Sequence, residues 1–178
     1  NESLGIAKSD GSRLWRFPMP SPGLTNVPTP LVVNESRLLI SGQGCKGTRC
    51  LEINNQNGKW SVSQKGFLPQ IEYFYGNWLR WSDDIVIGCT EAYLAAIDVA
   101  QGTVLGRYRG YGKGNVSRTR DQLIVVNGEG KLSLLTPNTV QSETSGFDVV
   151  GEFNLIQARC WTPLSYVDGR LFLRGDGR

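Results

Sequence analysis

The stretch Asn34-Glu35-Ser36-Arg37-Leu38-Leu39-Ile40 is a polar turn that leads into an apolar strand, and the chain repeats this pattern. The other copies are Ser82-Asp83-Asp84-Ile85-Val86-Ile87, Arg120-Asp121-Gln122-Leu123-Ile124-Val125-Val126 and Asp168-Gly169-Arg170-Leu171-Phe172-Leu173. When Leu38, Ile85, Leu123 and Leu171 are taken as equivalent, the mean step is about 44 residues, the length of a four-stranded propeller blade. The repeat therefore predicts an all-β propeller made of four-stranded antiparallel blades.

The segments around these strands fit the remaining places of a blade. First strands are expected at 29–33, 78–81, 115–119 and 162–167, and two of them begin with Thr-Pro-Leu. Pro suits the entry of a strand because no ladder N–H is required there. Third strands are expected at 50–53, 94–98 and 131–135, and fourth strands at 57–62, 101–108 and 148–153. Helical periodicity of useful length is absent from the sequence.

Each end of the chain fits half a blade. Residues 5–16 have the pattern of a third and a fourth strand, and residues 164–173 have that of a first and a second strand. We therefore expect one partial propeller domain over residues 1–178, with about three complete blades and two half blades. We interpret it as a window on a larger, eight-bladed ring. The alternative is that the two half blades pair and close a four-bladed ring.

Composition narrows the classes of function. The net charge is +3, from 19 basic and 16 acidic residues, which is too small and too mixed for a dedicated nucleic-acid binder. Apolar runs stay well short of the roughly 20 residues that a membrane span needs. The chain has no histidine, which excludes Ser-His-Asp and Cys-His nucleophile pairs and histidine metal ligands from these residues.

The four cysteines leave three interpretations open. Cys45 and Cys50 flank an expected hairpin tip, where a disulfide across the hairpin is sterically conceivable. A zinc site would need all four thiols, including Cys89 and Cys160, to converge, and the paired C-x2-C spacing is missing. The third interpretation is free thiols that pack as small apolar groups. We expect no metal site.

A family resemblance appears at the turn between third and fourth strands. Ala96-Ile97-Asp98-Val99-Ala100-Gln101-Gly102 resembles the Ala-x-Asp-x-x-x-Gly core of the pyrroloquinoline-quinone (PQQ) type propeller repeat. Ser9-Asp10-Gly11-Ser12-Arg13-Leu14-Trp15 adds the Gly-x-x-x-Trp ending of that repeat. The whole chain is similar to bacterial PQQ-binding-like propellers, which are often named after the BamB-type outer-membrane assembly lipoprotein. The resemblance implies that Trp15 docks against the next blade and is mostly buried. It also implies a periplasmic or otherwise extracytoplasmic location.

The chain departs from the quinoprotein dehydrogenases of this superfamily. Those enzymes hold PQQ between a Trp and two adjacent disulfide-bonded cysteines, with Ca²⁺ on Glu, Asn and Asp. Adjacent cysteines are absent from this sequence, so we assign no catalytic, cofactor-binding or metal residue. The resemblance thus implies a non-enzymatic scaffold that binds a protein or other ligand through blade loops or a central funnel. The alternative is a segment of a PQQ- and calcium-dependent alcohol or sugar dehydrogenase whose cofactor residues lie on other blades.

The densest aromatic stretch is the candidate binding surface. It comprises Tyr73, Tyr75, Trp78, Arg80 and Trp81, with Phe74 between them. Aromatic rings beside an arginine form stacking platforms for sugars or peptides. The competing interpretation is packing between blades. For Trp161 we expect burial, and hence a loss of about 3–5 kcal/mol on substitution by alanine.

Three other features have an architectural explanation that competes with a functional one. The glycine-rich run 110–114 could cradle a phosphate, but it joins two expected strands and fits an inter-blade loop better. The adjacent carboxylates Asp83 and Asp84 could act as acid and base, but neighbours in a turn point apart. A basic stretch could form a patch for an acidic partner or be a solvated outer strand; it comprises Arg107, Arg109, Lys113, Arg118 and Arg120.

Overall fold

The computed structural model describes residues 2–20, 26–73, 75–137 and 146–176, and these ranges contain strands and turns without a helix. In the described part, accordingly, no helix has the length and apolar character needed to cross a membrane. Sixteen strands form five sheets, all with antiparallel neighbours. The all-β expectation is confirmed.

Three of the sheets are complete blades, in which four consecutive strands pair in chain order. The first contains β3 (Leu31–Val32), β4 (Arg37–Ile40), β5 (Thr48–Gln56) and β6 (Lys59–Leu68). The second contains β7 (Leu79–Arg80), β8 (Ile85–Cys89), β9 (Tyr93–Asp98) and β10 (Thr103–Arg109). The third contains β11 (Asn115–Arg118), β12 (Leu123–Val126), β13 (Lys131–Pro137) and β14 (Phe147–Asn154).

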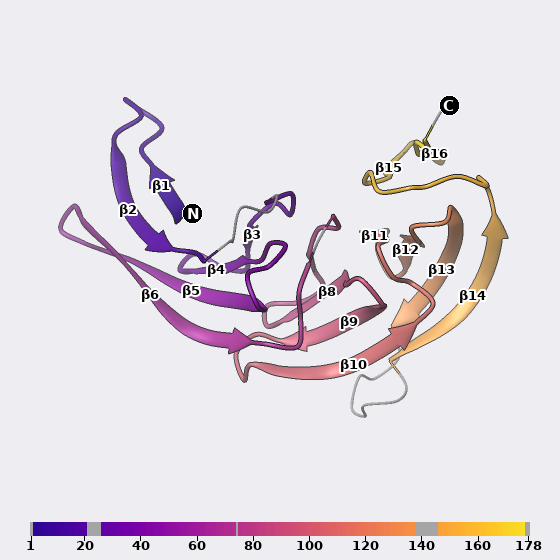
Figure 1. The fold of residues 1–178 in the computed structure, drawn as a ribbon, viewed down its shortest axis with the longest axis horizontal. Coiled ribbons are helices and arrows are strands. Elements are labelled where there is room, and N and C mark those ends of the chain that lie inside the picture. The colour runs from indigo at the N-terminus through magenta and orange to yellow at the C-terminus, as the bar shows by residue number, and fades with distance from the viewer. Residues whose placement is uncertain (1, 21–25, 74, 138–145, 177–178) are drawn as a thin grey trace.

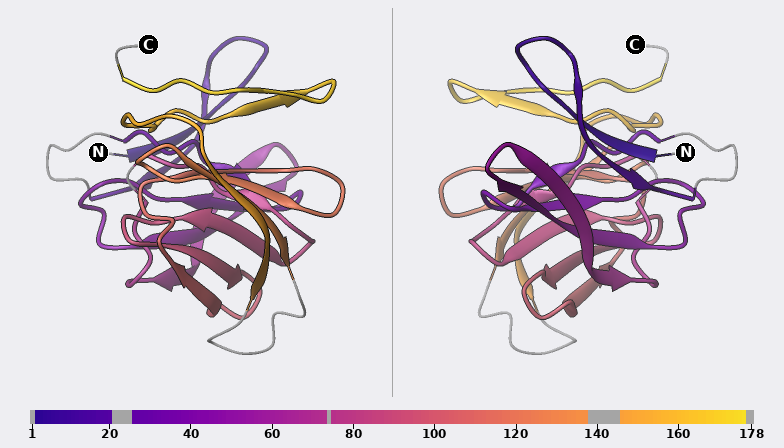
Figure 2. Two further views of the ribbon diagram at one scale, coloured as in Figure 1. Left: turned by 90° about the vertical axis from the view of Figure 1, so that its right-hand side faces the viewer. Right: turned by 90° about the vertical axis from the view of Figure 1, so that its left-hand side faces the viewer.

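The remaining two sheets have two strands each and lie at the ends of the chain. They are β1 (Glu2–Ile6) with β2 (Arg13–Pro18), and β15 (Ser165–Val167) with β16 (Arg170–Phe172). Figure 1 shows the five sheets following one another along an arc, with the β1–β2 hairpin and the β15–β16 hairpin at its two open ends. The side views in Figure 2 show the strands of successive sheets crossing at an angle, as twisted blades do.

The half blades do not pair with each other. β1 pairs only with β2, and β15 only with β16, among the described strands. The four-bladed closure considered above is therefore wrong for this structure. The division into three complete blades and two halves is confirmed, while the number of blades in a full ring stays a prediction.

One of the equivalences taken from the sequence is wrong by a residue. The amides of Val33, Trp81 and Thr119, just after the first strands, donate to the carbonyls of Arg37, Ile85 and Gln122, respectively. These three acceptors are therefore equivalent, and the residue that matches Leu38 and Leu123 is Val86, not Ile85. Side chains alternate between the two faces of a strand, and each face contacts a different neighbouring blade. A shift of one residue therefore changes which of the two neighbouring blades a side chain contacts. Ile85 and Val86 are both apolar, so the sequence alone does not reveal this shift.

Local hydrogen bonds and backbone geometry explain the Asp, Asn and Gly residues at the turns of the repeat. The Asp98 carboxylate oxygen Oδ1 accepts hydrogen bonds from the backbone N–H groups of Ala100 and Gln101, both at 2.9 Å. Asn57 and Gly58 have φ of 53° and 84°, and Asp168 and Gly169 have φ of 48° and 74°. Two consecutive residues with positive φ suit a two-residue type I′ hairpin turn. The repeated Asp, Asn and Gly residues thus close hairpins.

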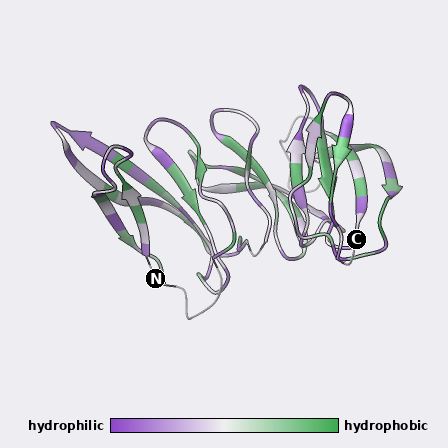
Figure 3. Cartoon of the chain, turned by 90° about the horizontal axis from the view of Figure 1, so that it is seen from above, coloured by the Kyte–Doolittle hydropathy of each residue, from purple (hydrophilic) through white to green (hydrophobic). Residues whose placement is uncertain are grey.

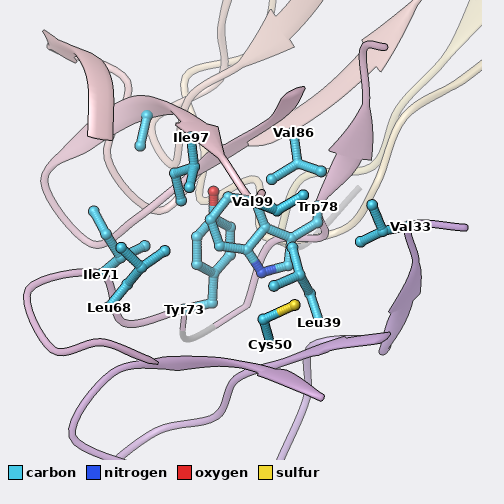
Figure 4. Packing of buried hydrophobic residues seen from close by; sticks show 11 residues of the cluster. Val33, Leu39, Cys50, Leu68, Ile71, Tyr73, Trp78, Val86, Ile97 and Val99 are labelled. Atoms are coloured by element: carbon cyan, nitrogen blue, oxygen red, sulfur yellow. The ribbon is translucent and has the colours of Figure 1, made fainter. Parts of the chain in front are cut away.

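The core lies between the sheets. In the cluster drawn in Figure 4, Val33 and Leu39 of the first complete blade face Val86 of the second. A second cluster joins Ile87 of the second blade to Val125 of the third. Figure 3 shows the hydrophobic residues concentrated in the strands and the hydrophilic ones toward the hairpin tips. Each blade therefore depends on its neighbours for burial.

All four cysteines are buried and none of them forms a disulfide, so the bridge considered for Cys45 and Cys50 is not formed in this structure. Burial raises the pKa of the Cys50 and Cys89 thiols, which keeps both protonated at neutral pH. These two cysteines pack as small apolar side chains: Cys50 belongs to the cluster between the first two complete blades, and Cys89 to the next one.

Trp15 packs across its own hairpin and toward the next blade. Its indole covers Gly5, its partner across the β1–β2 hairpin, where a side chain on Gly5 would collide with the ring. The ring lines a cavity together with Leu38 and Ile40 of the next blade. Trp15 thus docks toward the neighbouring blade and is mostly buried, as the resemblance implies.

Candidate functional site

The aromatic stretch divides between core and surface. Tyr73 and Trp78 are buried, and their rings contact each other with centroids 4.0 Å apart in the cluster between the first two complete blades (Figure 4). A side chain at Gly88 would collide with the Tyr73 hydroxyl, so that glycine makes room for the ring. Burial raises the pKa of Tyr73 well above its ordinary value. These two residues pack blades together and present no ring to a ligand.

Trp81 and Arg80 are engaged in a contact between the second and third blades. The Arg118 guanidinium lies 4.4 Å from the Trp81 ring centroid and donates to the backbone carbonyls of Trp81 at 2.8 Å and Arg80 at 3.3 Å. The Arg80 side chain forms an ion pair with Asp83 at 2.7 Å. Arg118 therefore covers the ring that a stacking platform would expose. Phe74 lies outside the described residues.

Tyr75 belongs to a different arrangement, which no pattern in the sequence indicates. Its ring stacks on Trp161 with centroids 4.4 Å apart and planes 3° from parallel. The Arg159 guanidinium lies 4.7 Å from the centroid of the same indole. Asn115 is buried and donates from Nδ2 to the Trp161 carbonyl at 3.1 Å, which fixes the backbone of Trp161. Residues far apart in sequence thus form one column, Tyr75–Trp161–Arg159.

Trp161 is partly buried, so the loss on substitution by alanine stays a prediction, and we expect it below the 3–5 kcal/mol of a fully buried tryptophan. Its place is set by the neighbouring third blade, because Asn115 belongs to β11. The only signal in the sequence is its position just before Thr162-Pro163, at the entry of a first strand. That position favours a packing role, and no local pattern links residue 161 to residue 75.

The column borders a cavity of about 420 Å³, which we call the Trp161 cavity. Loops and turns of the last two complete blades meet the 155–164 connection here. The lining residues are Glu91, Gly110, Gly112, Lys113, Asn127, Gly128, Glu129, Arg159 and Trp161.

Backbone contacts define the walls of the Trp161 cavity. The Lys113 amide donates to the Thr90 carbonyl at 2.8 Å, and the Gly128 amide donates to the Gly112 carbonyl at 3.1 Å. A side chain on Gly112 would collide with the Glu91 carbonyl. The glycine-rich run 110–114 is therefore an inter-blade connection whose glycines permit close backbone approach. The inter-blade loop preferred from the sequence is confirmed.

The charges around the Trp161 cavity are mostly paired. Lys113 Nζ lies 3.3 Å from Glu91, and Arg159 Nε lies 2.9 Å from Asp176. Glu129 is exposed and forms no ion pair with any residue that the structure describes. The rim thus offers an indole, a guanidinium and an uncompensated carboxylate.

The basic stretch does not form one patch. Arg107 lies over the Tyr93 ring, Lys113 pairs with Glu91, and Arg118 binds the β7 region. The adjacent acids are also occupied separately: Asp83 pairs with Arg80, and Asp84 lies 3.7 Å from Arg37 of the preceding blade. Their carboxylates therefore serve different contacts, as expected for a turn.

The structure gives no basis for assigning a quinoprotein or metal site to this chain. No group of three or more Cys, Asp or Glu side chains that could hold a metal ion is found among them. Two adjacent cysteines are also absent from the sequence. We therefore derive no cofactor chemistry from this chain.

Comparison with known proteins finds similarity among solved structures, and not by sequence. No protein-family model matches the chain, and no curated protein matches it by sequence. The crystal structure of BamB from Moraxella catarrhalis is similar, with a TM-score of 0.48 and 12% sequence identity, over 97% of this chain. The chain spans 63% of the length of that structure.

Proposed function

We propose that this chain is a non-enzymatic propeller scaffold that binds a protein partner through the loops around the Trp161 cavity. The observation that carries the proposal is the Tyr75–Trp161–Arg159 column at the edge of that cavity. Tryptophan, tyrosine and arginine are the residues most often found at energetic hot spots of protein interfaces. Of the five residues of the candidate surface, Tyr75 contributes to this column.

The column is preorganised for binding. Stacking on Tyr75 and the hydrogen bond from Asn115 hold Trp161 in place, so a partner would order few side chains on this side. The Arg159 side chain stays 56% exposed although it pairs with Asp176, which leaves donors accessible. The carboxylate of Glu129 favours a basic group on the partner.

Site-directed photo-crosslinking tests this proposal and requires no identified partner. A photoreactive residue replaces Glu129 at the rim of the cavity, and a second version carries it at Lys59 on the exposed tip of the β5–β6 hairpin. Native cells producing each version are irradiated, and the adducts are identified by mass spectrometry. We expect one defined protein adduct from position 129 that is absent from position 59.

Matched variants make the result specific. Trp161→Ala and Arg159→Ala should each reduce the position-129 adduct at least about tenfold, equivalent to 1.4 kcal/mol. Trp60→Ala removes an exposed tryptophan on β6, away from the cavity, and should leave the position-129 adduct unchanged. An adduct that survives both cavity variants, or the same adduct from position 59, would contradict the proposal.

We also propose a bacterial extracytoplasmic setting, supported by the repeat resemblance. Fractionation of cells that produce the full-length protein tests it. Recovery with periplasmic or envelope markers is expected, and recovery with cytoplasmic markers would contradict it.

A further inference from the structure

A cavity lies beside the outer strand of the second complete blade, and we call it the β10 groove. Its volume is about 320 Å³, which is within the range of ligand pockets. The end of β6 and the connection after it contribute Leu68 and Gln70 to its lining. β10 contributes Thr103, Val104, Gly106 and Arg107. The β10 groove shares no lining residue with the Trp161 cavity and is therefore a separate candidate site.

The β10 groove runs along a strand edge whose backbone groups are open. Figure 1 shows β10 on the outer side of the arc, and its only partner among the described strands is β9. The Thr90 amide, just after β8, donates to the Tyr93 carbonyl, so Tyr93 and Ala95 direct their backbone groups toward β8. Arg109 and Arg107 lie directly opposite these two residues. The N–H and C=O groups of both arginines therefore point to the open edge.

The side chains of the same two arginines give this edge a positive charge. Arg107 and Arg109 are exposed, and neither forms an ion pair with any residue that the structure describes. They are two positions apart on one strand and so lie on the same face. The Arg107 guanidinium is 5.7 Å from the centroid of the Tyr93 ring, and the Tyr93 hydroxyl donates to the Gln70 carbonyl at 3.1 Å. These contacts hold the charge at the groove, where it favours a carboxylate.

The outer strands of the other two complete blades carry charges that their own blade compensates. Lys65 on β6 lies 2.9 Å from a carboxylate oxygen of Glu52 on β5. Glu152 on β14 lies 2.6 Å from the ammonium group of Lys131 on β13. On β10, by contrast, both arginines lack a counterion among the described residues. The combination of an open edge, a cavity and an uncompensated positive charge thus distinguishes β10.

We propose that the β10 groove binds an extended, acidic peptide segment of a partner, which adds to the edge of β10 as a further strand. The open N–H and C=O groups of Arg107 and Arg109 bond to the backbone of the added strand, as in other cases of strand addition. The two guanidinium groups select carboxylates at alternate positions of the peptide, since alternate side chains lie on one face. This site goes beyond the function proposed for the Trp161 cavity and does not depend on it.

Fluorescence anisotropy of labelled synthetic peptides with the purified protein tests the proposal. The probe is a peptide in which valine and glutamate alternate, and its counterpart has lysine in place of glutamate. We expect the valine–glutamate peptide to bind at low salt and the valine–lysine peptide to bind at least about tenfold more weakly, equivalent to 1.4 kcal/mol. Arg107→Glu should weaken binding of the valine–glutamate peptide by at least the same factor. Arg120→Glu, at an exposed position between β11 and β12, should leave it unchanged.

A second pair of probes tests the added strand itself. One valine–glutamate peptide is N-methylated at its valines and the other at its glutamates, which removes the hydrogen-bond donors along one edge or the other. We expect one of these peptides to lose binding and the other to retain it, because a single edge of the peptide faces β10.

Circular dichroism confirms that both variants are folded, which the exposure of the two positions favours. Failure of the valine–glutamate peptide to bind at its highest soluble concentration overturns the proposal and points to an edge that another segment covers. Binding that Arg107→Glu does not weaken places the peptide elsewhere and also overturns it. Loss of binding by both methylated peptides, or by neither, contradicts strand addition.

Discussion

β12 and β16 occupy the same place in the repeat but have different surroundings. All four residues of β12 are buried, and Leu123 and Val125 are fully inaccessible. All three residues of β16 are exposed, although Leu171 and Phe172 are as apolar as their counterparts. β12 pairs on both edges and has a blade on each side, whereas β16 pairs only with β15 among the described strands. The apolar repeat thus specifies a strand, while burial depends on neighbouring strands and blades.

The largest expected effect compares two tryptophans in these two environments. Trp78→Ala removes a ring that is 6% exposed between two complete blades and should reduce the free energy of unfolding by about 3–5 kcal/mol. Trp161→Ala removes a half-buried ring next to the last half blade and should cost about 1–2 kcal/mol, mainly its stacking and partial burial. Urea unfolding followed by circular dichroism measures both. Equal losses would show that the two environments do not differ as described.

A smaller effect compares the equivalent leucines. Leu123→Ala creates a cavity in the cluster between the second and third blades and should cost about 2–4 kcal/mol. Leu171→Ala, at the matching position of β16, should cost below about 1 kcal/mol in dilute protein because the side chain is 37% exposed. Thermal unfolding at low concentration gives both values. A loss at Leu171 as large as that at Leu123 would mean that β16 is covered in the monomer.

The smallest effect concerns a polar network that only a complete blade can assemble. Glu152 on β14 accepts hydrogen bonds from Tyr111 and Ser133, both at 3.1 Å, and pairs with Lys131 at 2.6 Å. The bond to Lys131, followed by those to Ser133 and Tyr111, lowers the pKa of Glu152. The ionised carboxylate therefore stabilises the fold above the pKa of the unfolded state, and this contribution is lost as pH falls through the lower pKa of the folded state.

Glu152→Gln should accordingly lower stability by a small amount at neutral pH, because the network is close to solvent. The difference from the unmodified chain should shrink as the pH is lowered through the acidic range, which urea unfolding at a series of pH values measures. Glu35→Gln, at an exposed turn position, serves as the control and should show little effect at any pH. A Glu152→Gln difference that stays constant or grows toward acidic pH would contradict the assigned network.

The repeat is sufficient to predict the strands but not the candidate site. Periodicity and turn residues place the complete blades and the half blades, because both are local properties of the chain. The equivalence of Ile85 with Leu38 fails, since apolar residues on both faces of a buried strand conceal a shift of one residue. The Trp161 cavity is missed because Tyr75 and Trp161 meet only when separate blades pack. Tyr73 and Trp78 fall in the candidate surface because composition does not distinguish a core aromatic from an exposed one.

Amide hydrogen exchange tests most directly whether the ends of the arc differ from its interior. In dilute, monomeric protein, β12 amides should exchange slowly and β16 amides several orders of magnitude faster, because only β12 lies between paired strands and packed blades. Equal protection of β12 and β16 in the dilute monomer would contradict the account.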